Sequence, residues 1–220
     1  MKKQIITILF ALATVTGQTQ ENATGVAYVD LGLPSGTLWA TCNVGATVPE
    51  EFGEHFAWGE TEPKKKYRWN SYKWCKRSKN RITKYCIKSK SGKVDNKMEL
   101  LPEDDAATAN WGSEWQMPSY DQIKELYNNE YTTTEWTVQK GVNGMLITSK
   151  KNGNTIFLPS AGEQYGTSLY RAGMEGDYWS RSLDTSYGGS AYDLYFNSCI
   201  IDWNNGRRCY GRSVRPVRKK

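Results

Sequence analysis

The chain has 220 residues, a length that suits one domain. Its formal net charge is +6, and +4 if the two lysines near the N-terminus are removed with a leader, which is too mild for a dedicated nucleic-acid binder. Aromatic residues make up 13% of the chain and glycines are spread throughout it, so we expect a core built on Trp and Tyr with much irregular loop.

Residues 1–20 have the features of a secretory signal peptide. Lys2 and Lys3 precede a short apolar run from Ile5 to Val15, and small or polar residues follow it. This run is too short for a comfortable membrane span, although an N-terminal anchor or a buried helix is the alternative. No other stretch is apolar enough to cross a bilayer. We therefore expect an exported protein in which residues 21–220 form a single domain.

Export would place the five cysteines in an oxidising compartment, where disulfides form. Cys75 and Cys86 bracket a short basic segment, and Cys199 and Cys209 flank a predicted turn, so each pair is a disulfide candidate. Cys42 is then left over. The alternative is that all five thiols are free. We expect no zinc site and no cofactor, because the chain has no Cys-x-x-Cys pair and a single histidine.

Two strands are predicted at the start of the mature chain, one from Tyr28 and one around Leu38 to Cys42. The sequence Leu33-Pro34-Ser35-Gly36 between them is typical of a turn. Trp39 and Trp58 are predicted to be core or loop-packing aromatics.

Residues 64–93, here called the basic segment, contain thirteen Lys or Arg residues and no Asp or Glu. Trp69, Tyr72, Trp74 and Tyr85 are interleaved with the cations. One interpretation is an arm that contacts phosphate, sulfate or uronic acid groups. The other, which we favour, is a solvated hairpin whose aromatic side chains pack inward, because runs of charge are usually solvated faces.

Two helices are predicted after the basic segment. Pro102-Glu103-Asp104-Asp105 should open the first, since acids are stabilised at a helix N-terminus, and this interpretation is preferred to a calcium site. Trp111-Gly112 should end it. The second helix should begin at Ser119 with a capping box and carry Ile123 and Leu126 on its buried face.

Three strands are predicted to follow, at residues 132–138, 145–149 and 155–158. A turn is expected at Asn143-Gly144, and residues 159–176 are expected to be loop.

The C-terminal part, from Gly176 onward, shows a strand pattern. Apolar and polar residues alternate from Tyr192 to Asn197, which predicts Leu194 and Phe196 in the core and Asp193, Tyr195 and Asn197 in water.

A short strand is predicted from Ile200 to Trp203, and Asn204-Asn205-Gly206 is typical of a turn. A last strand is predicted from Gly211 to Val217, with Val214 and Val217 buried.

The exposed side of this C-terminal region is predicted to be a ligand-binding face. It combines rigid aromatic side chains, which supply contact area, with small polar groups, which supply hydrogen bonds. Trp203, Tyr195 and Tyr187 are the expected anchors, and the arginines are the expected charged contacts. The complete predicted set is Arg181, Ser182, Asp184, Ser186, Tyr187, Tyr192, Asp193, Tyr195, Asn197, Asp202, Trp203, Asn204, Asn205, Arg207, Arg208 and Tyr210.

Several long motifs in this chain resemble the Fibrobacter succinogenes major paralogous domain family. They are YWSRSL, AYDLYFNS and RCYGRSVRPV near the C-terminus, and DLGLPSGTLWATCNVGATVPEEFGEHFAWGETEPK and DDAATANWGSEWQMPS before them. The resemblance covers about residues 28–218. It implies an α+β, C-type-lectin-like fold with two short helices, small antiparallel sheets and long irregular loops. It also implies that the two chain ends pair in one sheet.

Formylglycine-generating enzymes share this fold, and Met117-Pro118-Ser119 resembles their sequence before the second helix. Their use of a C-terminal cysteine pair would implicate Cys199 and Cys209, but these are better explained as a bridge, and no catalytic motif appears. Glu62-Pro63-Lys64 departs from the calcium-binding lectin motif, and Asp202-Trp203-Asn204-Asn205 only echoes it. We therefore expect neither catalysis nor a bound metal.

The C-terminal region also resembles the variable segment of proteins diversified by retroelements. In such proteins, randomised adenines produce Asn, Ser, Tyr, Asp and Thr codons at ligand-facing positions, and the predicted face is rich in these residues. The expected function is that of a secreted, monomeric module that binds a protein or glycan on a cell or phage surface. Its expected location is the periplasm or outer surface of a Gram-negative bacterium. The alternatives are a structural surface or fimbrial component and a formylglycine-generating-type enzyme.

Overall fold

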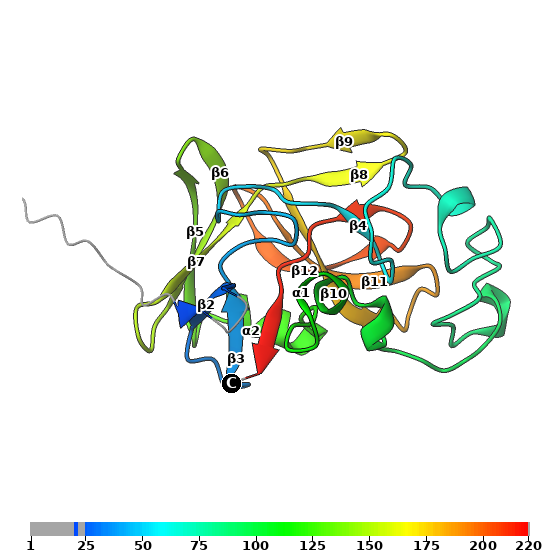
Figure 1. Cartoon of the computed structure of the whole chain (residues 1–220), viewed down its shortest axis with the longest axis horizontal. Coiled ribbons are helices and arrows are strands. Elements are labelled where there is room, and N and C mark those ends of the chain that lie inside the picture. The colour runs from blue at the N-terminus through cyan, green and yellow to red at the C-terminus, as the bar shows by residue number, and fades with distance from the viewer. Residues whose placement is uncertain (1–19, 22–24, 220) are drawn as a thin grey trace, which may run out of the picture.

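A computed structural model describes residues 20–21 and 25–219 of the chain. The predicted signal peptide lies outside the described residues except for Gln20. The described part is an α+β arrangement of small antiparallel sheets with few helices (Figure 1). Among these residues, no helix is both long enough and apolar enough to span a membrane.

The first sheet brings the two ends of the chain together. Its strand order is β1-β2-β3-β14, and β14 pairs antiparallel with β3, so that Val217 lies opposite Trp39. Pairing of the chain ends, which the family resemblance implied, is confirmed. The strands are β1 (Gln20–Glu21), β2 (Ala27–Asp30), β3 (Thr37–Ala40) and β14 (Val217–Lys219).

Two three-stranded meanders form the body of the molecule (Figure 1). The first contains β5 (Thr132–Gln139), β6 (Val142–Ser149) and β7 (Thr155–Pro159). The second contains β10 (Gly176–Leu183), β11 (Ser190–Phe196) and β12 (Ile201–Arg207).

A fourth sheet has the order β4-β13-β8-β9, and its β8–β9 hairpin lies at the upper edge of the molecule in Figure 1. It contains β4 (Phe56–Ala57), β8 (Glu163–Tyr165), β9 (Ser168–Tyr170) and β13 (Gly211–Arg212). The prediction that residues 159–176 are loop is therefore wrong for the β8–β9 hairpin. These two strands have three residues each, mostly polar or aromatic, so the sequence shows no alternation of apolar and polar residues that would predict them.

The core is aromatic, as the composition predicted. One hydrophobic cluster packs Leu126 of helix α2 (Tyr120–Tyr127) against Trp39, Phe196 and Val217. A second cluster contains Trp58, Trp115, Trp179, Tyr85 and Val214. Trp39 and Trp58 are at most 1% exposed, so both are core residues.

The second predicted helix is confirmed, and the first is shorter than expected. Helix α2 (Tyr120–Tyr127) begins after Ser119, whose side chain forms a capping box with Gln122. Helix α1 (Ala106–Trp111) begins after Asp105, because the Asp105 carboxylate accepts a hydrogen bond from the Thr108 backbone N–H. The preceding acids belong to a 3₁₀ turn, η3 (Pro102–Asp104).

Two Asn-Gly signals for turns are wrong. Asn143-Gly144 lies inside β6, and the actual β5–β6 turn is at Lys140-Gly141, where both residues have positive φ. A Cβ atom at position 144 would collide with the Leu158 carbonyl oxygen and the Phe157 ring, so this glycine permits a close strand approach.

Asn204-Asn205-Gly206 lies inside β12, paired with β11 along its length. A Cβ atom at position 206 would lie 2.6 Å from a guanidinium nitrogen of Arg212. Gly206 therefore leaves room for the Arg212 guanidinium. The chain turns at residues 208–210 instead. The last predicted strand is split into β13 and β14, with Val214 and Val217 buried as expected.

The basic segment is irregular rather than a hairpin. It contains the 3₁₀ turns η1 (Trp69–Ser71) and η2 (Ser89–Ser91), and a single antiparallel bridge joins Cys75 and Ile82. Tyr72 and Tyr85 are buried, as the inward-packing interpretation predicted. In Figure 1 the segment extends to the right-hand end of the molecule, away from the β5-β6-β7 sheet.

The close approach at position 144 gives a stability prediction. Gly144→Ala should lower the free energy of unfolding by about 3 kcal/mol, because the neighbouring atom is backbone and cannot turn aside. Gly141→Ala is the control: no atom lies within 4 Å of its Cβ position, so only the positive φ opposes it, at about 1–2 kcal/mol. Thermal and denaturant melts measure both. Equal losses would contradict the packing explanation.

Candidate ligand-binding site

The sixteen predicted site residues do not form one continuous face. Ser182, Asp184, Asp193 and Arg208 are buried, so their prediction as ligand contacts is wrong. The other twelve are exposed or half-buried, but they lie in separate places. The buried four explain how the exposed ones are held.

Asp193 was expected to face water but is 0% exposed. It lies on β11, the middle strand of its sheet, and the face that it occupies is covered by Arg212 from β13. The Arg212 guanidinium forms ion pairs with Asp193, with Asp177 at 3.2 Å and with Glu163 at 2.9 Å. The strand alternation identified the two faces correctly, but it could not show that both are covered.

Arg208 is buried beneath the basic segment. Its guanidinium donates to the Tyr72 hydroxyl at 3.0 Å and to the backbone carbonyls of Tyr85 and Lys84 at 2.9 and 3.0 Å. It also lies over the Trp58 ring, 4.7 Å from the ring centroid. Arg208 therefore holds the basic segment against the end of β12.

Asp184 and Ser182 support the loop and helix around them. The Asp184 carboxylate accepts from the Ser186 backbone N–H at 2.7 Å, which fixes the turn that presents Tyr187. The Ser182 hydroxyl accepts from the Tyr120 backbone N–H at 3.0 Å, at the start of helix α2. Both residues support neighbouring segments without being accessible themselves.

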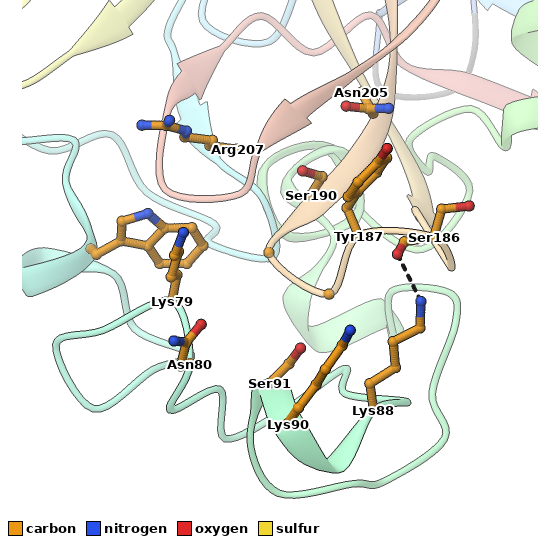
Figure 2. Close-up of a pocket in the computed structure, with 13 residues that line it drawn as sticks. Lys79, Asn80, Lys88, Lys90, Ser91, Ser186, Tyr187, Ser190, Asn205 and Arg207 are labelled. Atoms are coloured by element: carbon orange, nitrogen blue, oxygen red, sulfur yellow. Dashed lines mark hydrogen bonds between the residues drawn. The ribbon is translucent and has the colours of Figure 1, made fainter.

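A cleft separates the basic segment from the β10–β11 loop and the end of β12 (Figure 2). Its volume is about 540 Å³. Four predicted site residues meet there: Ser186, Tyr187, Asn205 and Arg207. We call it the cationic cleft, and its lining is Trp69, Lys79, Asn80, Lys88, Lys90, Ser91, Ser186, Tyr187, Gly188, Gly189, Ser190, Asn205 and Arg207.

The wall contributed by the basic segment was not predicted to join these residues. Its signal was present in the sequence, as a run of cations without an acid, but we favoured the solvated interpretation. In the structure the aromatics Tyr72 and Tyr85 do pack inward, while Lys79, Lys88 and Lys90 line the cleft. The two interpretations describe opposite sides of one segment.

Gly188 allows the two walls of the cleft to approach each other. A Cβ atom at position 188 would lie 2.8 Å from the Ser91 Cβ, whereas one at position 189 would lie 3.4 Å from the Trp69 ring, an ordinary van der Waals contact. Across the gap, the Lys88 ammonium donates to the Ser186 carbonyl at 2.7 Å, the dashed line in Figure 2. The two walls therefore lie close together at Gly188 and are bridged by one lysine.

The electrostatics of the cleft are one-sided. Lys79, Lys88, Lys90 and Arg207 line it, and its lining contains no carboxylate. Within the part of the chain that the structure describes, none of these four cations forms an ion pair. Figure 2 shows the ends of Lys79, Lys88 and Lys90 directed from the basic segment toward the opposite wall.

A second group of predicted residues forms an aromatic cluster with helix α2. Tyr192 stacks on Tyr120 with 4.3 Å between ring centroids, and Trp203 meets both rings edge-on. Trp203 remains 42% exposed, and Lys124 lies over the Tyr120 ring. Asp202 and Asn204, on the same strand, are exposed.

Tyr195 does not join the other expected anchors. It pairs with Asp202 on the opposite face of the sheet from Trp203, which lies across from Leu194. Its hydroxyl accepts from the Asn197 side-chain amide at 2.9 Å.

The last two predicted contacts are engaged within the protein. The Tyr210 hydroxyl accepts from Arg207 at 3.2 Å, and Arg181 forms an ion pair with Glu99 at 3.0 Å. These contacts orient both side chains and leave them half-buried.

The five cysteines are free in this structure, so neither candidate disulfide is formed. Cys209 packs in a small buried cluster with Cys75, Tyr67 and Tyr72, and Cys199 is exposed. Burial raises the pKa of Cys209 to about 12. A cysteine nucleophile needs the opposite shift, toward a more accessible thiolate.

The acids considered for calcium have structural partners. Asp104 accepts from the Lys84 ammonium and from the Tyr85 hydroxyl at 2.6 Å, while Asp105 caps helix α1 and accepts from the Met117 backbone N–H. Within the described ranges, no group of three or more potential metal-ligating side chains converges.

The burial of Arg208 predicts a large loss of stability for Arg208→Met. The variant would leave two buried carbonyls without their donor, which should cost about 3 kcal/mol and expose the basic segment to proteolysis. The neighbouring exposed residue gives a matched control: Arg207→Met should change stability by less than about 1 kcal/mol. Denaturant melts and limited proteolysis measure both effects. Similar behaviour of the two variants would show that Arg208 does not anchor the segment.

The burial of Asp193 predicts a pH dependence. Removal from water raises the pKa of this carboxyl to about 7 despite the attraction of Arg212, and the nearby charge of Asp177 adds to the rise. The folded state therefore holds the proton more tightly than the unfolded state does. The stability that this proton contributes is present at low pH and is lost as the pH rises through about 7.

Asp193→Asn should remove this dependence. Relative to the wild type, the variant should gain stability between about pH 4 and pH 8, on the order of 1.4 kcal/mol per unit of pKa difference. Parallel stability–pH curves for the two proteins would contradict the assignment.

Comparison of the chain with protein-family models, with curated proteins and with solved structures finds no match. The similarity to the Fibrobacter succinogenes major paralogous domain family thus rests on the sequence motifs alone.

Proposed function

We propose that the chain is a secreted ligand-binding module with a C-type-lectin-like fold, and that the cationic cleft is its principal binding site. The family motifs support this fold, as do the paired chain ends, the small antiparallel sheets and the two short helices. The ligand is a protein or glycan on a cell or phage surface. The module acts as a monomer in the periplasm or at the outer surface of a Gram-negative bacterium.

The cleft carries this proposal because it presents polar groups and an aromatic ring that the fold does not use. Its volume of about 540 Å³ lies within the range of small-ligand sites. Tyr187 is 64% exposed on a turn that Asp184 fixes, so its ring is available at little cost in conformational entropy. The aromatic cluster around Trp203 offers a second contact area for a larger ligand.

The lining of the cleft favours binding over catalysis. It consists of lysine, arginine, serine, asparagine, glycine and aromatic side chains, without a carboxylate, histidine or cysteine. General acid–base or nucleophilic catalysis most often uses one of those missing groups. The raised pKa of Cys209 also argues against the alternative of a formylglycine-generating-type enzyme, because a cysteine nucleophile needs an accessible thiolate.

Diversification by a retroelement is a narrower hypothesis. It requires variable codons to encode accessible side chains, and the burial of Ser182, Asp184 and Asp193 removes three of the positions in the sequence-based set. Ser186, Tyr187 and Asn205 in the cleft, and Asn204 on β12, keep the required exposure and residue type.

The decisive experiment compares two exposed tyrosines. Tyr187→Ala should reduce binding to the ligand, identified on a glycan array or among surface proteins, by about tenfold or more, because an aromatic anchor is lost. Tyr170→Ala, on the β8–β9 hairpin, is the matched control and should bind normally. Neither substitution should shift the melting temperature by more than about 2 °C, since both side chains are exposed.

Equal loss of binding in both variants would contradict the proposed site. Self-association of the wild-type chain at micromolar concentration, measured by sedimentation without ligand, would favour the alternative of a structural surface or fimbrial component.

A further inference from the structure

The lining of the cationic cleft contains no acid to compensate its cations, unlike the surroundings of several other basic side chains in the described structure. Elsewhere, Lys64 pairs with Glu60, Lys84 with Asp104, and Arg212 with three carboxylates. In the cleft, four cations share one cavity whose lining has no acid. Like charges gathered in this way repel one another, and a polyanion would relieve that repulsion.

We infer that the ligand of the cleft is an anionic glycan, with sulfate or carboxylate groups carried on sugar rings. This inference rests on the proposed function of the cleft and specifies its ligand class. Lys79, Lys88 and Lys90 approach from one wall and Arg207 from the other. Anionic groups on neighbouring sugars can therefore be held from both sides.

The neutral part of the lining suits a carbohydrate rather than a bare anion. Ser186 and Ser190 present hydroxyls, and Asn80 and Asn205 present amides that both donate and accept, which matches the hydroxyl groups of sugars. The Tyr187 ring adds an exposed aromatic surface for the apolar face of a sugar ring. A cavity of about 540 Å³ is far larger than phosphate or sulfate alone requires.

Nucleic acid fits the same features less well. Single strands are held by several accessible aromatic platforms along a continuous basic groove. Here Trp69 is half-buried, and Tyr187 is the exposed aromatic side chain in the lining of the cleft. The net charge of +4 that remains without Lys2 and Lys3 is also low for a nucleic-acid binder.

Two of the lysines allow a test that does not disturb the fold. Lys79 and Lys90 are exposed, and their side chains form no ion pair with any other described residue. Lys76 and Lys93 are equally exposed in the same segment but do not line the cleft. The double variants Lys79→Gln/Lys90→Gln and Lys76→Gln/Lys93→Gln therefore remove the same charge from different places.

The probes are oligosaccharides of dextran sulfate, polygalacturonate and neutral dextran, together with a single-stranded DNA oligonucleotide. Titration calorimetry on the purified full chain should detect binding of a sulfated or carboxylated probe and none of neutral dextran. That binding should weaken strongly with added salt, as expected for screened charges. The cleft variant should lose about tenfold in affinity, and the control variant less than about twofold. Comparison of the first two probes identifies the anionic group.

Equal losses in the two double variants would overturn the inference, because the attraction would then be diffuse. Binding of DNA as tightly as the charged glycan would also overturn it, in favour of a nucleic-acid ligand. Absence of binding to both charged glycans, or equal binding of neutral dextran, would overturn it as well. If charged-glycan binding is absent, or if neutral dextran binds equally, the proposed function still stands where Tyr187→Ala weakens binding to the array-identified ligand by about tenfold or more. It fails if that variant binds normally.

Discussion

The buried guanidinium of Arg208 is the interaction on which the cleft depends. Among the described residues it pairs with no carboxylate, and it is surrounded by a tyrosine hydroxyl, three backbone carbonyls and the faces of Trp58 and Tyr72. A charge so far from water is tolerated only while every one of these groups stays in place. Arg208, at the end of β12, therefore helps to fix the position of the basic segment, together with the Lys84–Asp104 ion pair and the Lys88–Ser186 hydrogen bond.

Arg208 is one of three buried arginines that the C-terminal segment sends into different parts of the molecule. Arg212 lies among the carboxylates of Glu163, Asp177 and Asp193. Arg215 donates to the Asn43 side chain and to the carbonyls of residues 40, 41 and 157. Because each guanidinium satisfies acceptors from a distant segment, the last strands of the chain complete the fold as well as adding to the sheets.

The burial of Arg208 also illustrates which features can be predicted from sequence and which cannot. Local signals were sufficient for the capped helix at Ser119, for the buried tryptophans and for the alternation that puts Leu194 and Phe196 in the core. Burial of Asp193 and Arg208 depends on partners far away in the chain, which no local pattern contains. From sequence alone, a polar side chain is therefore predicted to be exposed, because its buried partner is not visible there.

The same limit explains the misplaced turns and the incomplete site. Glycine at positions 144 and 206 serves close approach by a neighbouring strand or guanidinium, and sequence alone does not distinguish this use from a positive φ. The cleft joins Lys79 and Lys90 to Ser186 and Tyr187, residues about a hundred positions apart. Its two walls were each visible in the sequence, one as a run of cations and one as a polar aromatic loop, but their meeting depends on tertiary structure.

The residues that support the cleft are distinct from those whose side chains line it. Arg208 and Asp184 are buried and Gly188 lies against Ser91, so a change at any of these three residues would alter the shape of the cleft. Lys79, Lys90 and Tyr187 extend from that frame as exposed side chains. Substitutions at such positions change the free energy of folding little and the chemistry of the cleft greatly. A fixed frame with replaceable contacts is what a binding module needs in order to change its ligand while keeping its fold.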